Sequence, residues 1–290
     1  MGYEGNIQWY PGHMTKTRRM IEADLKQVDA VVEIVDARIP ESSRNPIINE
    51  LVGSKPRIIL LNKCDYADDA ATERWKKYYQ MQGCAVLCCD CRSGKGIKGF
   101  VPLLKKELCE LLEKRRAKGM IGRMLRIMVL GIPNVGKSSF INRMANSRKT
   151  TVGDRPGVTR GKQWVTIDKE VELLDMPGIL WSKFEDREAA EKLAFTGAVK
   201  DEVLDAEALA DSLGEYLKEH YPRRLIERYR LKTLEGRTCE LIARARGMMI
   251  SGGEPDTERA AAALLDEYRS GKLGKITLEE PVFENIREPL

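Results

Sequence analysis

Eight consecutive residues of this sequence have the types and spacing needed to hold a chain of phosphates. Residues 131 to 138 (GIPNVGKS) fit the pattern G-x-x-x-x-G-K-[ST] and lie between an apolar run and a helical pattern. Glycines in such a loop let backbone N–H groups surround a phosphate, the lysine reaches the outer phosphates, and the serine hydroxyl is a Mg²⁺ ligand. The sequence therefore predicts a phosphate-binding loop that uses Asn134, Val135, Gly136, Lys137, Ser138 and Ser139.

A second motif, Asn62-Lys63-Cys64-Asp65, follows another apolar run and bears on which base is bound. The Asp65 carboxylate can accept hydrogen bonds from N1–H and N2–H₂ of guanine together, whereas adenine has no N1 proton. Leaving that charge unpaired costs about a few kcal/mol. Asn62 is expected either to contact the base edge or to tie the loops together, and the stem of Lys63 to cover the base. We therefore expect GTP and GDP as ligands, which disfavours an ATP-dependent kinase.

A third motif, Asp175-Met176-Pro177-Gly178, ends an apolar run. Asp175 is predicted to hold Mg²⁺ through water, and the Gly178 N–H to sense the γ-phosphate. Between this motif and the phosphate loop lies a Pro/Gly-rich segment, residues 155 to 161, in which Thr159 is the predicted Mg²⁺ ligand. Simple turn chemistry is the alternative for that segment. The predicted Mg²⁺ set is therefore Ser138, Thr159 and Asp175.

The elements that position these motifs alternate between strand and helix. Apolar runs predict parallel strands, a hairpin is expected across the turn at residues 168 and 169, and helical spacing lies between the strands. The strands are expected at residues 29–35, 57–61, 84–89, 125–130, 163–167 and 170–174, and the helices at 72–82 and 101–118. This alternation predicts an α/β, doubly wound and mostly parallel sheet.

The order of the motifs is unusual. Conventional guanine-nucleotide switches run phosphate loop, threonine loop, D-x-x-G and then N-K-x-D, whereas here N-K-x-D at residues 62–65 precedes the phosphate loop. A circularly permuted chain can still form the same sheet, with the helical stretch 101–118 bridging the ordinary ends. The segment after Gly178 then runs into the C-terminal part of the chain, so the nucleotide can bias the position of that part.

Strand signals stop after residue 186, and the length of 290 residues suits two domains. Helical spacing predicts an all-α domain, with helical segments at residues 189–217, 225–231, 239–249 and 257–268. We expect a GTPase domain at 1–182 and a helical domain at 183–290. With 42% hydrophobic and 32% charged residues the chain is globular, and no apolar run approaches the ~18 residues of a membrane span.

The seven cysteines are an odd number without a secreted framework, which favours a reducing compartment. Four of them lie between Cys84 and Cys91, where no C-x-x-C pair occurs, so small apolar side chains on a strand are favoured over a metal site. The N-terminus, residues 1–20, has neither an apolar core nor a cleavage site. These features predict a cytoplasmic protein.

Charge is unevenly distributed along the chain. The net charge is +5, yet residues from 200 onward hold 15 basic and 19 acidic residues, while residues 220–250 hold eight basic and three acidic. A second basic stretch, residues 105–126, has the same balance. Such clusters suit a phosphate backbone, and solvated helix faces are the alternative.

The permuted order and four further segments closely resemble the circularly permuted ribosome-biogenesis GTPases of the YlqF/RbgA type. The segments are residues 9–14 (WYPGHM), 36–40 (DARIP), 131–138 (GIPNVGKS) and 175–181 (DMPGILW). The resemblance covers nearly the whole chain. It implies binding to a late precursor of the large ribosomal subunit, GTP hydrolysis stimulated by that particle, and release of the protein as the particle matures.

The resemblance also implies roles for individual residues. Ile179 stands where a Ras-like enzyme carries its water-orienting Gln, so His13 is the candidate to orient the water, beside Lys137. A structural role is the alternative for His13. Asn134 resembles the asparagine that holds K⁺ in potassium-activated GTPases. Cys91 and Arg92 stand in the base loop where S-A-K is usual, with the role of Asp90 left open.

For the helical domain the resemblance implies contacts with ribosomal RNA, and a plain stabilising bundle is the alternative. Arg223, Arg224, Arg228 and Arg230 are expected to contact phosphates without base specificity. Tyr229 is expected either to stack on a base or to lie in the core. Ribosomal proteins are further expected partners, and a monomer is expected. The alternative function is a GTP-regulated RNA- or protein-binding switch with negligible intrinsic hydrolysis.

Overall fold

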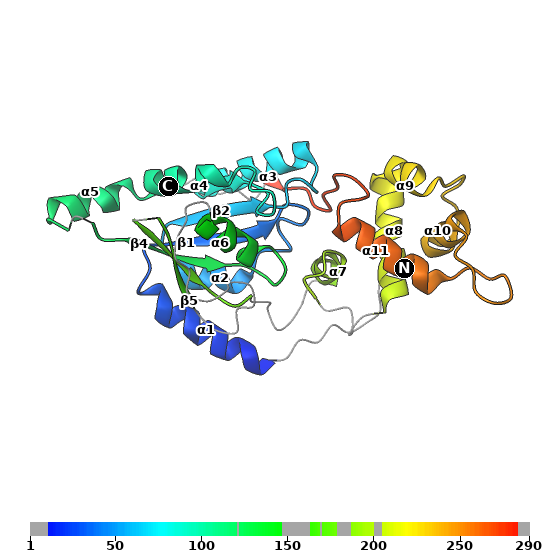
Figure 1. The fold of residues 1–290 in the computed structure, drawn as a ribbon, viewed down its shortest axis with the longest axis horizontal. Helices are drawn as coiled ribbons and strands as arrows, with labels where there is room; N and C mark the ends of the chain where they lie inside the picture. The colour runs from blue at the N-terminus through cyan, green and yellow to red at the C-terminus, as the bar shows by residue number, and fades with distance from the viewer. Residues whose placement is uncertain are drawn as a thin grey trace. The chain divides into compact units, whose positions relative to one another are not determined.

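The computed structural model describes residues 11–120, 122–146, 163–168, 170–178, 187–199 and 205–283, with side chains from Arg18 onward except those of Asn146 and Asp168. The chain divides into two compact units (Figure 1). One unit holds the described residues from 11 to 178 together with 277–283. The other holds the described residues from 187 to 276.

The first unit is built on a six-stranded sheet in the order β3-β2-β1-β4-β6-β5. All neighbouring strands pair in parallel except β5 and β6, which form the predicted antiparallel hairpin. The strands are β1 (Ala30–Asp36), β2 (Arg57–Asn62), β3 (Ala85–Cys88), β4 (Leu125–Leu130), β5 (Gln163–Asp168) and β6 (Val171–Asp175). The strand order reverses direction between β1 and β4, and ligands of such sheets bind at the carboxyl ends beside that switch point.

Helices cover both faces of this sheet, as expected for a doubly wound fold (Figure 1). Apolar residues of α1 (Pro11–Leu25) and α2 (Pro46–Val52) pack with β1, β4 and β6 in one cluster. A second cluster joins α3 (Asp69–Met81) to β1, β2 and β3. Phe100 of α4 (Phe100–Glu107) meets Phe140 of α6 (Lys137–Asn146) edge to face, with ring centroids 5.0 Å apart.

Two features of this unit differ from what the sequence predicts. The helix expected at 101–118 is two helices, α4 and α5 (Cys109–Ala117), which meet at Leu108. α5 is largely polar and Arg115 is its one buried residue, so it has no apolar face to continue along the sheet. The expected domain boundary also differs, because residues 277–283 belong to the sheet unit rather than to the helical one. The residue pattern had not shown that the chain returns to the sheet.

The second unit is all-helical in its described part, as expected. Its α-helices are α7 (Arg187–Phe195), α8 (Ala206–His220), α9 (Pro222–Tyr229), α10 (Thr238–Arg246) and α11 (Thr257–Arg269). Buried leucines of α8, α9 and α11 form its core. At Gly214 of α8 any side chain would collide with Thr238 of α10, so glycine is what lets these two helices approach closely. No helix in the parts of the chain described here is long and apolar enough to cross a membrane.

A buried carboxylate organises the basic part of this helical unit. Glu267 of α11 accepts two hydrogen bonds from Arg228, both 2.9 Å, and two from Arg246, at 2.8 and 3.2 Å. Arg246 also lies 4.6 Å from the centroid of the Tyr229 ring, which is 1% exposed. Tyr229 is therefore a core residue and does not stack on a base. Glu267 holds two of the three guanidinium nitrogens of Arg228, whose side chain is still 36% exposed, so the expected contact of Arg228 with phosphate stays a prediction.

Burial alone would raise the pKa of Glu267, but hydrogen bonds from Arg228 and Arg246 outweigh burial and lower it to about 2. The carboxylate therefore stabilises the folded protein fully above about pH 4.5, and this contribution is lost as the pH falls towards 2. We expect Glu267→Gln to lower the free energy of unfolding by about 1–2 kcal/mol at pH 7.

Urea unfolding of the full chain between pH 7 and pH 3 measures this effect. The difference between Glu267→Gln and the wild type should be constant down to about pH 4.5 and shrink below it. Glu235→Gln, at an exposed loop position, should leave unfolding unchanged throughout. A difference that stays constant down to pH 3 would contradict this account of the Glu267 cluster.

Candidate functional site

The phosphate loop joins β4 to α6 at the carboxyl edge of the sheet, as the sequence predicts. Its backbone needs unusual dihedral angles, since Gly136 has φ +106° and Asn134 has φ +57°. A side chain at Gly131 would lie 2.7 Å from the Ile34 carbonyl oxygen of β1. The glycines are therefore required both by backbone conformation and by close approach of neighbouring segments.

A cavity of about 460 Å³ opens over this loop. It is lined by Pro133, Asn134, Gly136, Lys137, Ser138, Ser139, Met176 and Gly178. A side chain at Gly178 would reach within 2.9 Å of the Lys137 amine, so glycine keeps the cavity open beside that amine. Two of the three predicted motifs thus meet in one cavity.

Lys137 is the buried cation of this cavity. Its amine donates hydrogen bonds to the carbonyl oxygens of Gly131, at 2.9 Å, and Ile132, at 2.8 Å. Burial lowers the pKa of Lys137 to about 8, although the charge of Asp175 acts to raise it. Asp175 itself is 3% exposed at the end of β6. The amine is therefore held over the loop, where phosphate oxygens can replace its backbone acceptors.

Asn62, at the end of β2, connects the phosphate loop to the loop after β3. Its side-chain amide donates to the carbonyl oxygen of Val135 at 2.7 Å, and its oxygen accepts from the Cys91 N–H at 2.9 Å. A side chain at Gly136 would collide with the Asn62 amide. Of the two roles expected for Asn62, the structure contains the contact that ties the loops together.

Asp65 and Asp90 occupy different positions near this junction. Asp65 is exposed, but nearby protein atoms partly desolvate its carboxyl, and this desolvation together with the charge of Asp90 raises the pKa of Asp65 above the usual value. Asp90 accepts hydrogen bonds from the N–H groups of Arg92 (2.8 Å) and Ser93 (3.2 Å). Burial alone would raise the pKa of Asp90, but these hydrogen bonds lower it. Asp90 therefore fixes the turn that presents Cys91 and Arg92, a role the sequence left open.

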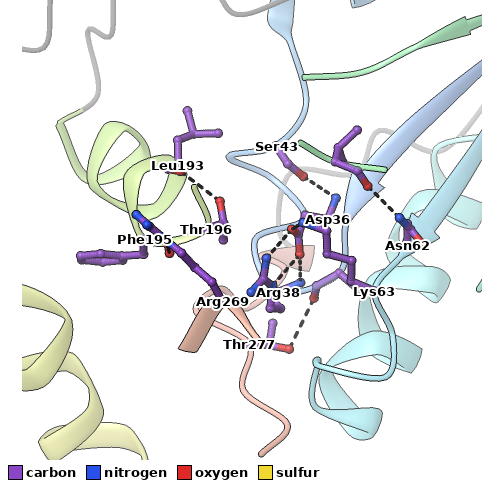
Figure 2. A network of polar contacts seen from close by, with 12 residues as sticks. Asp36, Arg38, Ser43, Asn62, Lys63, Leu193, Phe195, Thr196, Arg269 and Thr277 are labelled. Atoms are coloured by element: carbon purple, nitrogen blue, oxygen red, sulfur yellow. Dashed lines mark hydrogen bonds and ion pairs between the residues drawn. The ribbon is translucent and has the colours of Figure 1, made fainter. Parts of the chain in front are cut away.

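A buried ionic cluster lies directly behind the N-K-x-D motif (Figure 2). The Lys63 amine lies 2.8 Å from a carboxylate oxygen of Asp36, at the end of β1. Arg38 donates to both oxygens of the same carboxylate, at 3.0 and 2.8 Å, and is 1% exposed. Burial alone would raise the pKa of Asp36, but the charges of Arg38 and Lys63 hold it well below its usual range.

This cluster changes the expectation for Lys63. Its φ of +63° is a left-handed conformation, and burial lowers the pKa of its amine despite the pairing with Asp36. The amine is thus anchored in the protein by Asp36. Asp36 and Arg38 had no assigned role in the sequence analysis. The signal available there was the polar D-A-R that directly follows the buried strand β1.

Three residues to which the sequence gives roles have side chains outside the described part of the chain. Thr159 lies outside the described residues, as does Ile179. His13 lies in the first turn of α1, but its side chain is outside the described part of the chain. The remaining predicted residues lie at the ends of β2 and β6, on the loops after β2, β3, β4 and β6, and in the first turn of α6, at the carboxyl edge of the parallel strands.

A mostly parallel sheet with this phosphate loop after β4 and N-K-x-D after β2 defines a P-loop GTPase whose strands are circularly permuted in the chain. The family model described as "50S ribosome-binding GTPase" matches residues 126–226. Ribosome biogenesis GTPase A of Priestia megaterium is 47% identical over 95% of this chain and 97% of its own length. Mitochondrial ribosome-associated GTPase 1 of mouse is 34% identical, over 95% of this chain and 91% of its own.

The solved structures agree with these relatives. The GDP-bound structure of YlqF from Thermotoga maritima has a TM-score of 0.66 and 29% identity, covering 91% of this chain and 99% of that one. The chain belongs to the ribosome biogenesis GTPase A family. It is a GTP hydrolase that binds GTP and GDP.

The lowered pKa of Lys137 predicts that nucleotide binding depends on pH. Phosphates favour the charged amine, so binding requires protonation of a group whose pKa is about 8 in the free protein. We expect the affinity for GDP to fall about fourfold between pH 7 and pH 8.5.

Calorimetric titration with GDP in buffers of different ionisation enthalpy measures the accompanying proton uptake. Lys137→Arg, which stays charged over this range, should bind GDP with a flat pH profile, whatever its absolute affinity. An affinity of the wild type that does not change between pH 7 and pH 8.5, with no proton uptake, would contradict this account of Lys137.

Proposed function

We propose that this GTPase binds a late precursor of the large ribosomal subunit and that GTP hydrolysis on the particle promotes its maturation and the release of the protein. The observation that carries the proposal is the near full-length similarity to a ribosome biogenesis GTPase, combined with a phosphate loop and N-K-x-D at one sheet edge. The cytoplasm is the proposed site of action.

The proposed nucleotide contacts follow from the site. Asp65 reads guanine, the Cys91 N–H and Arg92 frame the base, and residues 134–139 surround the phosphates. Oxygen ligands suit Mg²⁺, and Ser138, Thr159 and Asp175 are the proposed set. The cation would neutralise charge that develops on the phosphates. Asn134 is proposed to hold K⁺ beside them, as the family resemblance implies.

The proposed hydrolytic group is His13, which would orient the attacking water, while Lys137 stabilises charge on the phosphates. The position of His13 on α1, after the P-G of residues 11 and 12, supports this proposal only through the family resemblance. The protein would remain a slow enzyme until the particle completes the catalytic arrangement.

Exposed arginines of the helical unit are the proposed contacts with ribosomal RNA. Arg223, Arg224 and Arg230 are exposed on or directly after α9, and so is Arg228, although part of its guanidinium binds Glu267. Contacts of this kind bind phosphates without reading bases, so they contribute affinity for a folded RNA surface. Ribosomal proteins of the same particle are further proposed partners.

GTP turnover with and without purified large ribosomal subunits tests the proposal. We expect the subunits to raise turnover at least severalfold in KCl and less in NaCl, because K⁺ supplies charge beside the phosphates.

His13→Ala should lose most of this gain and bind GDP as the wild type does. Arg223→Ala should reduce the stimulation of GTP turnover at low subunit concentration, and it should leave turnover without subunits unchanged.

Turnover that large subunits leave unchanged would contradict the proposed partner and favour a GTP-regulated switch with negligible hydrolysis. A His13→Ala variant that responds to subunits as the wild type does would contradict the catalytic assignment alone. Small ribosomal subunits, added at the same concentration, provide the control for general effects of RNA.

A further inference from the structure

The C-terminal residues 277–280 form a strap that lies on the sheet unit, 200 or more residues along the chain from the loops it contacts. Three of its residues are almost fully buried, namely Thr277 and Leu278, both 3% exposed, and Glu279, 8% exposed. The Trp75 indole of α3 donates a 3.0 Å hydrogen bond to the carbonyl oxygen of Glu279. The strap is therefore packed into the domain rather than loosely attached to it.

Thr277 connects the ends of β1 and β2. Its hydroxyl accepts a hydrogen bond from the Asp68 N–H at 3.0 Å. The same hydroxyl donates one to the Ala37 carbonyl oxygen at 3.4 Å (Figure 2). Ala37 in turn donates from its N–H to the carbonyl oxygen of Asn62 at 2.8 Å. Asp68, which caps α3, is three residues after Asp65. Thr277 thus holds both flanks of the N-K-x-D segment.

Leu278 and Glu279 hold the loop that follows β1. The Leu278 N–H donates to the Arg38 carbonyl oxygen at 2.8 Å. The buried Glu279 carboxylate accepts from the N–H groups of Glu41, at 2.7 Å, and Ser42, at 3.2 Å, and from the Ser42 hydroxyl. This loop carries Arg38, whose guanidinium binds Asp36, the partner of Lys63.

We propose that Thr277 and Glu279 are positioning residues for the guanine site, acting on Lys63 and Asp65 through the loops after β1 and β2. The inference rests on the proposed assignment of Asp65 to the guanine base. The strap contacts described above all fall on these two loops and on α3, whereas the phosphates belong to the loop after β4. The strap should therefore govern the base contribution to affinity and not the phosphate contribution.

The geometry of hydrogen bonds explains why the strap affects the affinity for guanine. Hydrogen bonds from a base to a carboxylate are lost when the loop moves by about 1 Å, because they need heavy-atom distances near 2.9 Å and near-linear angles. Asp65 is exposed and lies on a loop, so its position depends on the backbone on either side. The strap directly follows Ile276, the last residue of the helical unit, so the peptide chain itself joins that unit to the segment that contacts the loops after β1 and β2.

The test compares GDP and ADP affinities for four strap variants of the full chain. Thr277→Val removes the hydroxyl at nearly unchanged shape, Thr277→Ser retains it, and Glu279→Gln removes the charge. Glu280→Gln is the matched control, because Glu280 neighbours Glu279 but forms an exposed ion pair with Arg74. We expect Thr277→Val and Glu279→Gln to weaken GDP binding five- to tenfold with ADP binding unchanged, and Thr277→Ser and Glu280→Gln to stay within twofold of the wild type.

If Thr277 and Glu279 position the guanine site, their variants lose the selectivity for GDP over ADP. If the two residues only stabilise the fold, the variants have a lower thermal stability and keep that selectivity. Folded Thr277→Val and Glu279→Gln variants with wild-type selectivity would overturn the inference. Asp65→Ala tests the assignment beneath it. If that variant keeps the preference for GDP, the base site and the strap inference are both overturned; if it loses the preference while the strap variants keep it, the strap inference alone fails.

Hydrogen exchange of the wild type provides a test that needs no variant. The amides of Asp68, Glu41, Ser42 and Leu278 donate the strap contacts, so their exchange should slow about tenfold when GDP binds and much less when ADP binds. Exchange at these amides that GDP leaves unchanged would overturn the inference.

Discussion

The pair of hydrogen bonds made by the Asn62 side chain is the interaction on which the nucleotide site depends. One reaches the phosphate loop at Val135 and the other reaches the base loop at Cys91, so three loops become one surface. The residues are far apart in the chain but lie at the same edge of the sheet, because β2, β1 and β4 are neighbours in it. Permutation therefore changes the order of the motifs without changing the site they form.

The elements around this junction are arranged to keep it rigid. Arg38 and Lys63 neutralise Asp36 behind the N-K-x-D motif, Asp90 fixes the turn at Cys91, and the strap holds the segments that flank the N-K-x-D motif. A buried ionic cluster of this kind is weak evidence for stability, because desolvation offsets much of the attraction. The cluster instead favours one conformation of the loops after β1 and β2, and so fixes the backbone on which the exposed Asp65 lies.

Much of the fold could be predicted because each strand is an apolar run with its own signal. The parallel strands, the antiparallel hairpin and the all-helical character of the described part of the second unit are confirmed, and so is the family resemblance. Contacts between distant segments carry no such signal. Nothing local to Glu279 or Thr277 indicates that they pack on the sheet unit, and Arg228 looks like a free cation until Glu267 is placed beside it.

The affinity of Asn62→Ala for GDP, measured beside its affinity for ADP, tests the central claim most directly. Losing two hydrogen bonds at a buried junction removes the coupling between the phosphate and base loops. The account predicts that a folded Asn62→Ala binds GDP at least about tenfold more weakly than the wild type, with a smaller GDP over ADP preference. A folded variant that binds both nucleotides as the wild type does would contradict it.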